Sequence, residues 1–234
     1  LKSNLRGEIN AMDRSQYVDA QVVGFGSGTI FMMPLWEASG LHAGAKVFLL
    51  SDADTAMVGD HLLGRVVDAL GEPLDGLSPI RTSQRQSLQG KPINPMQRQP
   101  IDRVLDVGVK AINAMLTVGC GQRLGLIAGS GVGKSVLLGM LTKFTSADVV
   151  VIGLIGERGR EVKEFIEQIL GPEGMGHAVV VAAPADNSPL LRIRATNLAH
   201  LYAEYFRAQG KDVLLLVDSM SRVAHAQREI GLAI

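Results

Sequence analysis

The sequence has little of what marks secreted or membrane-spanning proteins. It contains one cysteine, Cys120, so no disulfide can form within the chain, and its five histidines lack the spacing of metal ligands. The longest apolar runs, such as Val149–Ile155, fall well short of the roughly 18 residues that a membrane-spanning helix needs. Residues 1–16 carry charges and no apolar centre, which excludes a secretory signal peptide. These absences predict a protein of the cytoplasm.

The chain also lacks a net charge. Its 234 residues include 23 Lys and Arg and 23 Asp and Glu, spread evenly along the sequence, so a tail that binds nucleic acid is not expected. With 47% hydrophobic residues, the composition is that of a folded protein.

Two patterns of apolar residues divide the chain. Short alternating runs separated by glycines predict a small antiparallel sheet or barrel in residues 1–70. Residues 71–100 hold five of the nine prolines and are interpreted as a connector. Residues 101–234 alternate apolar runs with helical spacing, which predicts an α/β domain with a parallel sheet flanked by helices.

The elements of the α/β part follow from its apolar runs and its helix signals. Ser188 followed by Pro189 is a typical helix start, Gly210 is a typical stop, and a second helix is expected over residues 135–144. The expected strands are residues 123–128, 149–155, 178–183 and 213–217.

The segment 128–135, with the sequence AGSGVGKS, lies between an expected strand and an expected helix. Glycines let several backbone N–H groups turn toward one phosphate group, and the helix start adds positive charge. Lys134 would meet the β- and γ-phosphates, and Ser135 would offer a hydroxyl to Mg²⁺. A glycine-rich turn that binds nothing is the alternative, and the pattern does not identify the nucleotide. The predicted nucleotide-binding residues are Gly129, Ser130, Gly131, Val132, Gly133, Lys134, Ser135 and Val136.

Glu157 follows the expected strand 149–155, at the edge of a parallel sheet where ligands bind. A carboxylate there can orient a water molecule for attack on the γ-phosphorus. Arg158 and Arg160 would hold the carboxylate in place or meet phosphate. The alternative is that Glu157 and Glu161 only complement the positive start of the next helix and pair with the arginines.

Asp218 closes the strand that starts at Val213, and there it can hold Mg²⁺ through a water molecule, completing a site with Ser135. Aspartate also caps many turns, so the strand end alone is a weak signal. For Arg222, one helical turn later, a structural role is the favoured interpretation.

Taken together these motifs resemble the flagellar and type III secretion ATPases, which are relatives of the rotary ATPase catalytic subunits. The resemblance covers nearly the whole chain, residues 153–162 are its most specific part, and the flagellar branch is the most similar. In that family Ala128 is an ordinary first residue of the loop. The motifs that carry the resemblance are residues 63–68 (LGRVVD), 71–76 (GEPLDG), 128–135 (AGSGVGKS), 153–162 (GLIGERGREV) and 182–186 (AAPAD).

The resemblance implies a P-loop NTPase (RecA-like) fold preceded by part of a small β-barrel. It implies a homo-hexameric, Mg²⁺-dependent ATPase that drives protein export. Its partners would be export-apparatus proteins, regulators and exported proteins, at the cytoplasmic face of the inner membrane beside the export gate. By position, Lys134, Glu157 and Arg158 are the expected catalytic residues, and Ser135 and Asp218 the expected Mg²⁺ ligands.

Three other functions stay open at this point. A proton- or sodium-driven rotary ATPase subunit of the F or V type would share the site but associate with a central rotor stalk and a membrane ring, and a non-catalytic subunit would have no need of Glu157. An RNA-translocating helicase is disfavoured because aromatic residues make up only 4% of the chain and do not cluster with basic ones in the N-terminal region.

The ends of the sequence predict a piece of a longer chain. It starts at Leu1, and residues 222–234 look helical without a stop signal. The resemblance places part of the barrel before Leu1. After Ile234 it places an arginine that reaches the neighbouring subunit, the adenine pocket and a helical domain. We therefore expect this chain to bind nucleotide but to hydrolyse it poorly.

Overall fold

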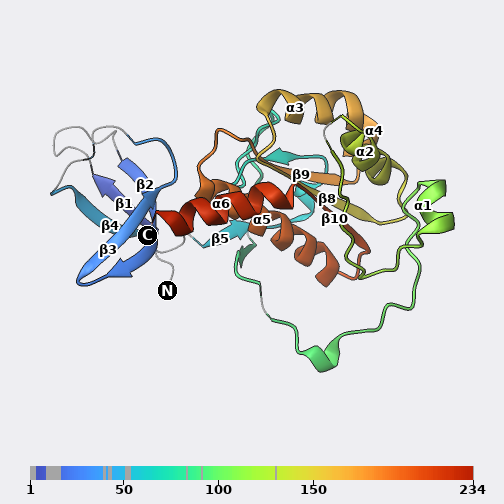
Figure 1. Cartoon of the computed structure of the whole chain (residues 1–234), viewed down its shortest axis with the longest axis horizontal. Coiled ribbons are helices and arrows are strands. Elements are labelled where there is room, and N and C mark those ends of the chain that lie inside the picture. Colours follow the sequence, from blue (N-terminus) through green and yellow to red (C-terminus); the bar gives the residue numbers. More distant parts are fainter. Residues whose placement is uncertain are drawn as a thin grey trace.

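A computed structural model describes residues 4–8, 17–38, 41, 44–50, 54–82, 84–90, 92–129 and 131–233. A small antiparallel sheet lies at one end of the molecule and a larger α/β unit at the other (Figure 1). The small sheet has the order β3-β2-β1-β4 and confirms the antiparallel sheet predicted for the N-terminal region. Its strands are β1 (Asn4–Glu8), β2 (Tyr17–Gly26), β3 (Thr29–Pro34) and β4 (Lys46–Leu50).

The α/β unit is built on a parallel sheet with the order β10-β8-β9-β6. Every residue of β8 and β9 is buried, as continuous apolar runs predict for strands covered on both faces. The predicted α/β fold is confirmed. The strands are β6 (Val66–Val67), β8 (Val149–Ile155), β9 (Ala178–Ala183) and β10 (Val213–Asp218).

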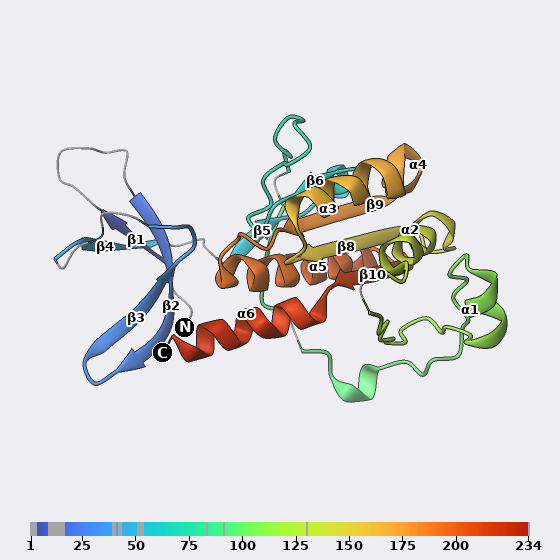
Figure 2. The same cartoon turned by 45° about the horizontal axis from the view of Figure 1, so that its top comes forward.

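Helices cover the two faces of this sheet as separate layers (Figure 2). Because side chains alternate along a strand, Val149 and Val151 of β8 pack with α5, whereas Val150 and Ile152 pack with α2 and the α3 segment. The helices on one face are α5 (Pro189–Ala208) and α6 (Met220–Leu232), and those on the other are α2 (Lys134–Phe144), α3 (Gly159–Glu164), the π-helix η3 (Phe165–Leu170) and α4 (Gly171–Met175).

The limits of α5 are set by the residues that sequence reasoning singled out. Ser188 Oγ accepts a hydrogen bond from the backbone N–H of Leu191 at 3.3 Å, and Pro189 occupies the first turn. After the helix ends at Ala208, Gly210 adopts φ 83°, a conformation that glycine reaches without strain. None of the helices in the described part of the chain is both long and apolar enough to cross a membrane.

Residues 55–88 contribute to the α/β core. Val58, Leu62 and Val67 are almost fully buried and belong to the cluster around α5. β6 therefore belongs to the parallel sheet, although it lies within the range 1–70; the division into residues 1–70, 71–100 and 101–234 stays a prediction. The further elements here are β5 (Thr55–Met57), paired with β7 (Arg85–Ser87), and the 3-10 helix η1 (Asp60–Leu62).

An ion pair fastens the segment after β6 to the sheet. Arg65 Nε donates to Asp75 Oδ2 at 2.7 Å, and the same oxygen accepts from the backbone N–H of Val66 at 3.1 Å. The Arg65 hydrogen bond, chiefly, lowers the pKa of Asp75 to about 2. Because the folded-state pKa lies below the ordinary carboxyl value, the pair stabilises the fold at neutral pH, and this contribution is lost as the pH falls toward 2.

The strand predicted at residues 123–128 is wrong. Residues 121–129 form neither helix nor strand, and Leu124 and Ile127 are 61% and 98% exposed. An apolar run becomes a strand only where another strand offers free N–H and C=O groups, and no described strand pairs with this run. The other elements of this region are η2 (Pro95–Gln97) and α1 (Lys110–Met115).

Candidate functional site

The predicted site residues converge on the carboxyl edge of the parallel sheet. Asp218, the last residue of β10, is in register with Leu154 of β8, and Glu157 follows β8 by two residues. Two backbone hydrogen bonds hold the chain around Glu157, because Gly156 N–H donates to Ala183 O at 2.7 Å and Ala185 N–H donates to Glu157 O at 2.9 Å. The carboxyl edge thus receives two carboxylates from neighbouring strands.

Lys134, at the start of α2, reaches the same edge. Its Nζ lies 2.5 Å from Asp218 Oδ1. The Asp218 side chain is 7% exposed and that of Lys134 is 30% exposed. A buried carboxylate is costly without a partner of opposite charge, so this ion pair satisfies Asp218 within the protein.

The loop before α2 has the backbone that the glycine pattern predicts. Gly131 and Gly133 have φ values of 78° and 94°, and Gly133 is the N-cap of α2. No atom of the described residues lies within 4 Å of where a Cβ would sit on either residue, so backbone conformation rather than space accounts for glycine here. The remaining predicted loop residues, Gly129, Val132, Ser135 and Val136, are exposed, and Ser130 lies outside the described residues.

Glu157 is the carboxyl group whose environment is most unusual at this edge. Burial raises its pKa above the ordinary value, and so do the negative charge of Asp218 and a hydrogen bond with Glu161. The positive charges of Lys134 and Arg222 lower it by less. Glu157 therefore interacts with both Lys134 and Asp218. A carboxylate with a raised pKa is a better proton acceptor than an ordinary one.

The two arginines after Glu157 are exposed. The Arg158 side chain is 83% exposed, and its Nη1 donates to Glu161 Oε1 at 3.3 Å. Arg160 is exposed as well. Glu161 lies in the first turn of α3, as expected of a residue that complements a helix start. The structure therefore pairs Lys134 with Asp218, places Glu157 where both of their charges act on it, and pairs Arg158 with Glu161.

Sequence reasoning did not give Arg222 and Glu161 a part in the site. A Cβ on Gly156 would lie 2.8 Å from Arg222 Cβ, so only glycine lets the loop and α6 approach this closely. Arg222 thereby brings its charge to Glu157. The position of Arg222, one helical turn after Asp218, is the feature of the sequence that could have indicated this role.

The donor atoms at this edge suit Mg²⁺. This ion prefers oxygen ligands and keeps several water molecules, so it needs only one or two protein groups beside a phosphate. The Asp218 carboxylate and the exposed Ser135 hydroxyl supply such oxygens. Among the described residues, no group of three or more His, Cys, Asp or Glu side chains is placed to hold a metal ion.

Two substitutions are expected to move the pKa of Glu157 in opposite directions. Arg222→Gln removes a positive charge, so the pKa of Glu157 should rise. Glu161→Gln alters a hydrogen bond that raises the pKa of Glu157, so this pKa should fall. Carbon-13 NMR titration of the Glu157 carboxyl measures both shifts directly. Arg228→Gln, an exposed change farther along α6, is the control. Equal Glu157 titration curves in all three variants would contradict this arrangement of charges.

Comparison with known proteins gives a matching family model and several similar proteins. Residues 108–234 match the family model described as the ATP synthase alpha/beta family, nucleotide-binding domain. The chain is 52% identical over 238 residues to the flagellum-specific ATP synthase of Pseudomonas aeruginosa, covering 100% of this chain and 53% of that protein. It is 56% identical over 224 residues to that of Salmonella typhimurium, covering 93% and 49%.

Solved structures agree with the sequence matches. The assembled ATPase EscN from the type III secretion system of enteropathogenic E. coli superposes with a TM-score of 0.88 at 41% identity, over 98% of this chain and 55% of EscN. EscN in complex with its central stalk EscO gives a TM-score of 0.87 at the same identity and coverage. The chain spans about half the length of the curated relatives it matches.

Proposed function

The chain belongs to the ATP synthase alpha/beta family, and from that membership we propose that it binds ATP with Mg²⁺ and hydrolyses it to ADP and phosphate to drive protein export. The observation that carries the proposal is the meeting of Lys134, Glu157 and Asp218 at one sheet edge, beside a glycine loop that begins a helix. The similarity to flagellum-specific ATP synthases and to EscN supports export as the work that hydrolysis performs.

The residues at this edge take separate parts in the proposed reaction. When the nucleotide binds, the Lys134 ammonium group leaves Asp218 and contacts the β- and γ-phosphate oxygens, whose negative charge it neutralises. Ser135 and Asp218 would hold Mg²⁺, which adds positive charge at the phosphates when bound. Glu157 accepts a hydrogen bond from a water molecule and aligns it with the γ-phosphorus.

The attack of that water forms the new P–O bond as the bond to the bridging oxygen of ADP breaks. Glu157 receives the proton that the water gives up. The raised pKa of Glu157 suits this transfer, and it also means that hydrolysis falls on acidification at a higher pH than an ordinary glutamate would give. Arg158 stays part of the proposed catalytic set, and a phosphate would have to draw it away from Glu161.

Assembly and partners are part of the same proposal. EscN is described as assembled and as bound to a central stalk, EscO, which supports a homo-hexameric ring with a stalk partner here. Export-apparatus proteins, regulators and exported proteins complete the proposed partner set. The proposed location is the cytoplasmic face of the inner membrane, beside the export gate.

Deletion of the gene in its host tests the export function. We expect export by the flagellar or type III apparatus to stop while growth on a respiratory substrate continues, because export rather than ATP synthesis depends on the protein. A plasmid copy of the intact gene should restore export. Loss of respiratory growth with export intact would instead favour a rotary F- or V-type ATPase subunit, which shares the family model.

A further inference from the structure

Gly139, in the middle of α2, is a glycine that its backbone conformation does not require. It lies in regular helix without a positive φ, where alanine is the more favourable residue. Its surroundings explain it, because a Cβ on Gly139 would overlap Ile169 Cγ2 of the π-helix η3. Real Cβ atoms do not come that close to another atom, so the two helices must move apart if Gly139 gains a side chain. Glycine therefore allows α2 to approach η3 more closely than any other residue would.

The Ile169 side chain has little freedom to turn out of the way. Its Cγ2 is bonded directly to the branched Cβ, and a branched side chain keeps one strongly preferred χ1 rotamer in a helix. The next nearest atoms to a Cβ on Gly139 are Ile169 Cβ and Ile169 O, both at 3.7 Å, which is ordinary van der Waals contact. A single methyl group of Ile169 thus sets how closely α2 and η3 pack.

The two helices that meet at this contact follow different parts of the site. α2 begins at Lys134, directly after the glycine loop, whereas η3 continues α3, which starts two residues after Glu157. Glu157 is held to the sheet, because its backbone O accepts a hydrogen bond from Ala185 N–H at 2.9 Å and the N–H of Gly156 donates to Ala183 O. A shift of α2 away from η3 would therefore move the glycine loop and Lys134 together, while Glu157 stays with the sheet.

We propose that Gly139 and Ile169 are positioning residues for hydrolysis: their contact sets the distance between a γ-phosphate held by the glycine loop and the water molecule that Glu157 aligns. The inference rests on the proposed function. Attack needs the reacting atoms about 3 to 3.5 Å apart, and a misplacement of about 1 Å caused by a distant substitution can cost roughly 10²-fold in rate. Neither residue needs to touch the nucleotide, since both act through the placement of α2.

Two measurements on a Gly139→Ala variant of the full-length protein test this role. Single-turnover phosphate release should slow by about 10²-fold, while the affinity for ATP with Mg²⁺ changes by less than about threefold, because the loop and Lys134 move as one unit. Unchanged phosphate release overturns the inference, and so does an equal loss of affinity and rate. If the unaltered full-length protein does not hydrolyse ATP, the proposed function fails and this inference fails with it.

A second substitution tests whether the overlap itself is the cause. Ile169→Ala removes Cγ2, so the double variant Gly139→Ala/Ile169→Ala should regain most of the lost rate. Ile169→Val keeps Cγ2, so Gly139→Ala/Ile169→Val should stay slow. Equal rates in the two double variants overturn the inference. Where Gly139→Ala does not melt cooperatively, Ile169→Phe, which enlarges the other partner of the contact, is measured in its place with the same expected result.

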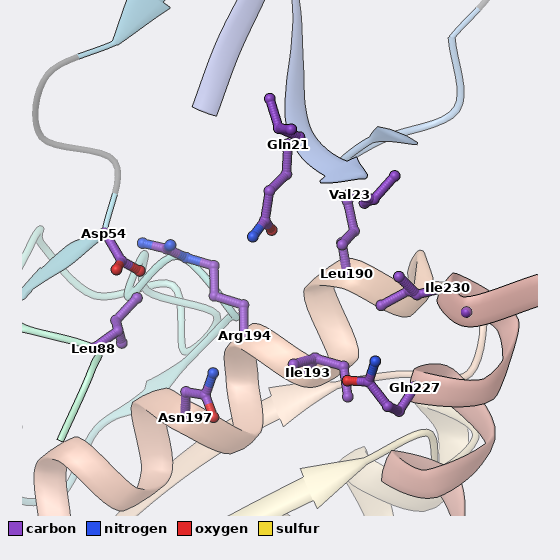
Figure 3. Close-up of a pocket in the computed structure, with 12 residues that line it drawn as sticks. Gln21, Val23, Asp54, Leu88, Leu190, Ile193, Arg194, Asn197, Gln227 and Ile230 are labelled. Atoms are coloured by element: carbon purple, nitrogen blue, oxygen red, sulfur yellow. The ribbon is translucent and has the colours of Figure 1, made fainter. Parts of the chain in front are cut away.

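Two other substitutions that each add one methyl group are the controls. Gly174→Ala, in α4, places its Cβ 3.3 Å from Lys143 Cγ, and the flexible lysine side chain can move aside. Val23→Ile extends a side chain that lines a cavity of about 200 Å³ between β2, α5 and α6 (Figure 3). Both variants should release phosphate at the rate of the unaltered protein. A loss of rate in Gly174→Ala or Val23→Ile as large as that in Gly139→Ala overturns the inference.

Discussion

A Lys134→Ala variant of the full-length protein is expected to lose most nucleotide affinity and almost all hydrolysis. The ammonium group lies at the start of α2, 2.5 Å from Asp218, where the phosphates of a nucleotide held by the glycine loop would arrive. Removing one preorganised donor to a developing charge costs about 10²- to 10³-fold in turnover. Loss of a charge-assisted contact weakens binding by roughly tenfold or more. Titration with a fluorescent ATP analogue and measurement of phosphate release follow the two effects.

The same substitution carries a structural cost that must be separated from the functional one. Without Lys134 the Asp218 carboxylate is left buried and without its ion-pair partner, which destabilises the fold. Lys143→Ala, nine residues along the same helix, is the matched control, because its side chain packs near Gly174 rather than at the sheet edge. A Lys134→Ala protein that melts cooperatively and still binds the analogue as tightly as Lys143→Ala would contradict the site.

The parts of the fold that the sequence predicted are those whose signal is local. β8, β9 and β10 are continuous apolar runs, and a run buried on both faces carries its own pattern. β6 has only two residues, and it is a strand because β9 offers it a free edge, which no local pattern reports. The run at residues 123–128 fails for the converse reason: its composition suits a strand, but no described strand pairs with it.

The same distinction applies to the site: local motifs predict its residues, whereas the contacts among those residues depend on tertiary packing. Lys134, Glu157 and Asp218 follow from motifs at strand and helix ends, because parallel strands bring their carboxyl ends to one edge. The direct contact between Lys134 and Asp218 joins residues 84 positions apart and depends on how α2 sits against β10. The influence of Arg222 on Glu157 depends on the close approach of α6 to Gly156. The motifs predict which ligand each residue binds. They do not predict which of these residues contact one another in the folded chain.

A Glu157→Gln variant of the full-length protein is expected to keep nucleotide binding and lose hydrolysis. Glutamine has the same shape but cannot take a proton from the attacking water, and loss of a general base costs about 10²- to 10⁴-fold in rate. Binding should persist or tighten, because the substitution removes a negative charge that interacts with Asp218 beside the phosphate site. This separation of turnover from affinity distinguishes Glu157 from Lys134, whose loss affects both.

Single-turnover phosphate release measures the chemical step, and equilibrium titration with ATP and Mg²⁺ measures binding. Glu164→Gln, an exposed glutamate at the end of α3, is the control and should hydrolyse ATP at the rate of the unaltered protein. If Glu157 acts as the base, the acid limb of the pH profile should also move in Arg222→Gln and Glu161→Gln, in the directions that their effects on the Glu157 pKa require. Unchanged hydrolysis in Glu157→Gln would remove that carboxylate from the mechanism. Because a subunit that only assembles has no use for a proton acceptor with a raised pKa at this edge, binding of ATP without hydrolysis by the unaltered full-length protein would favour the non-catalytic alternative.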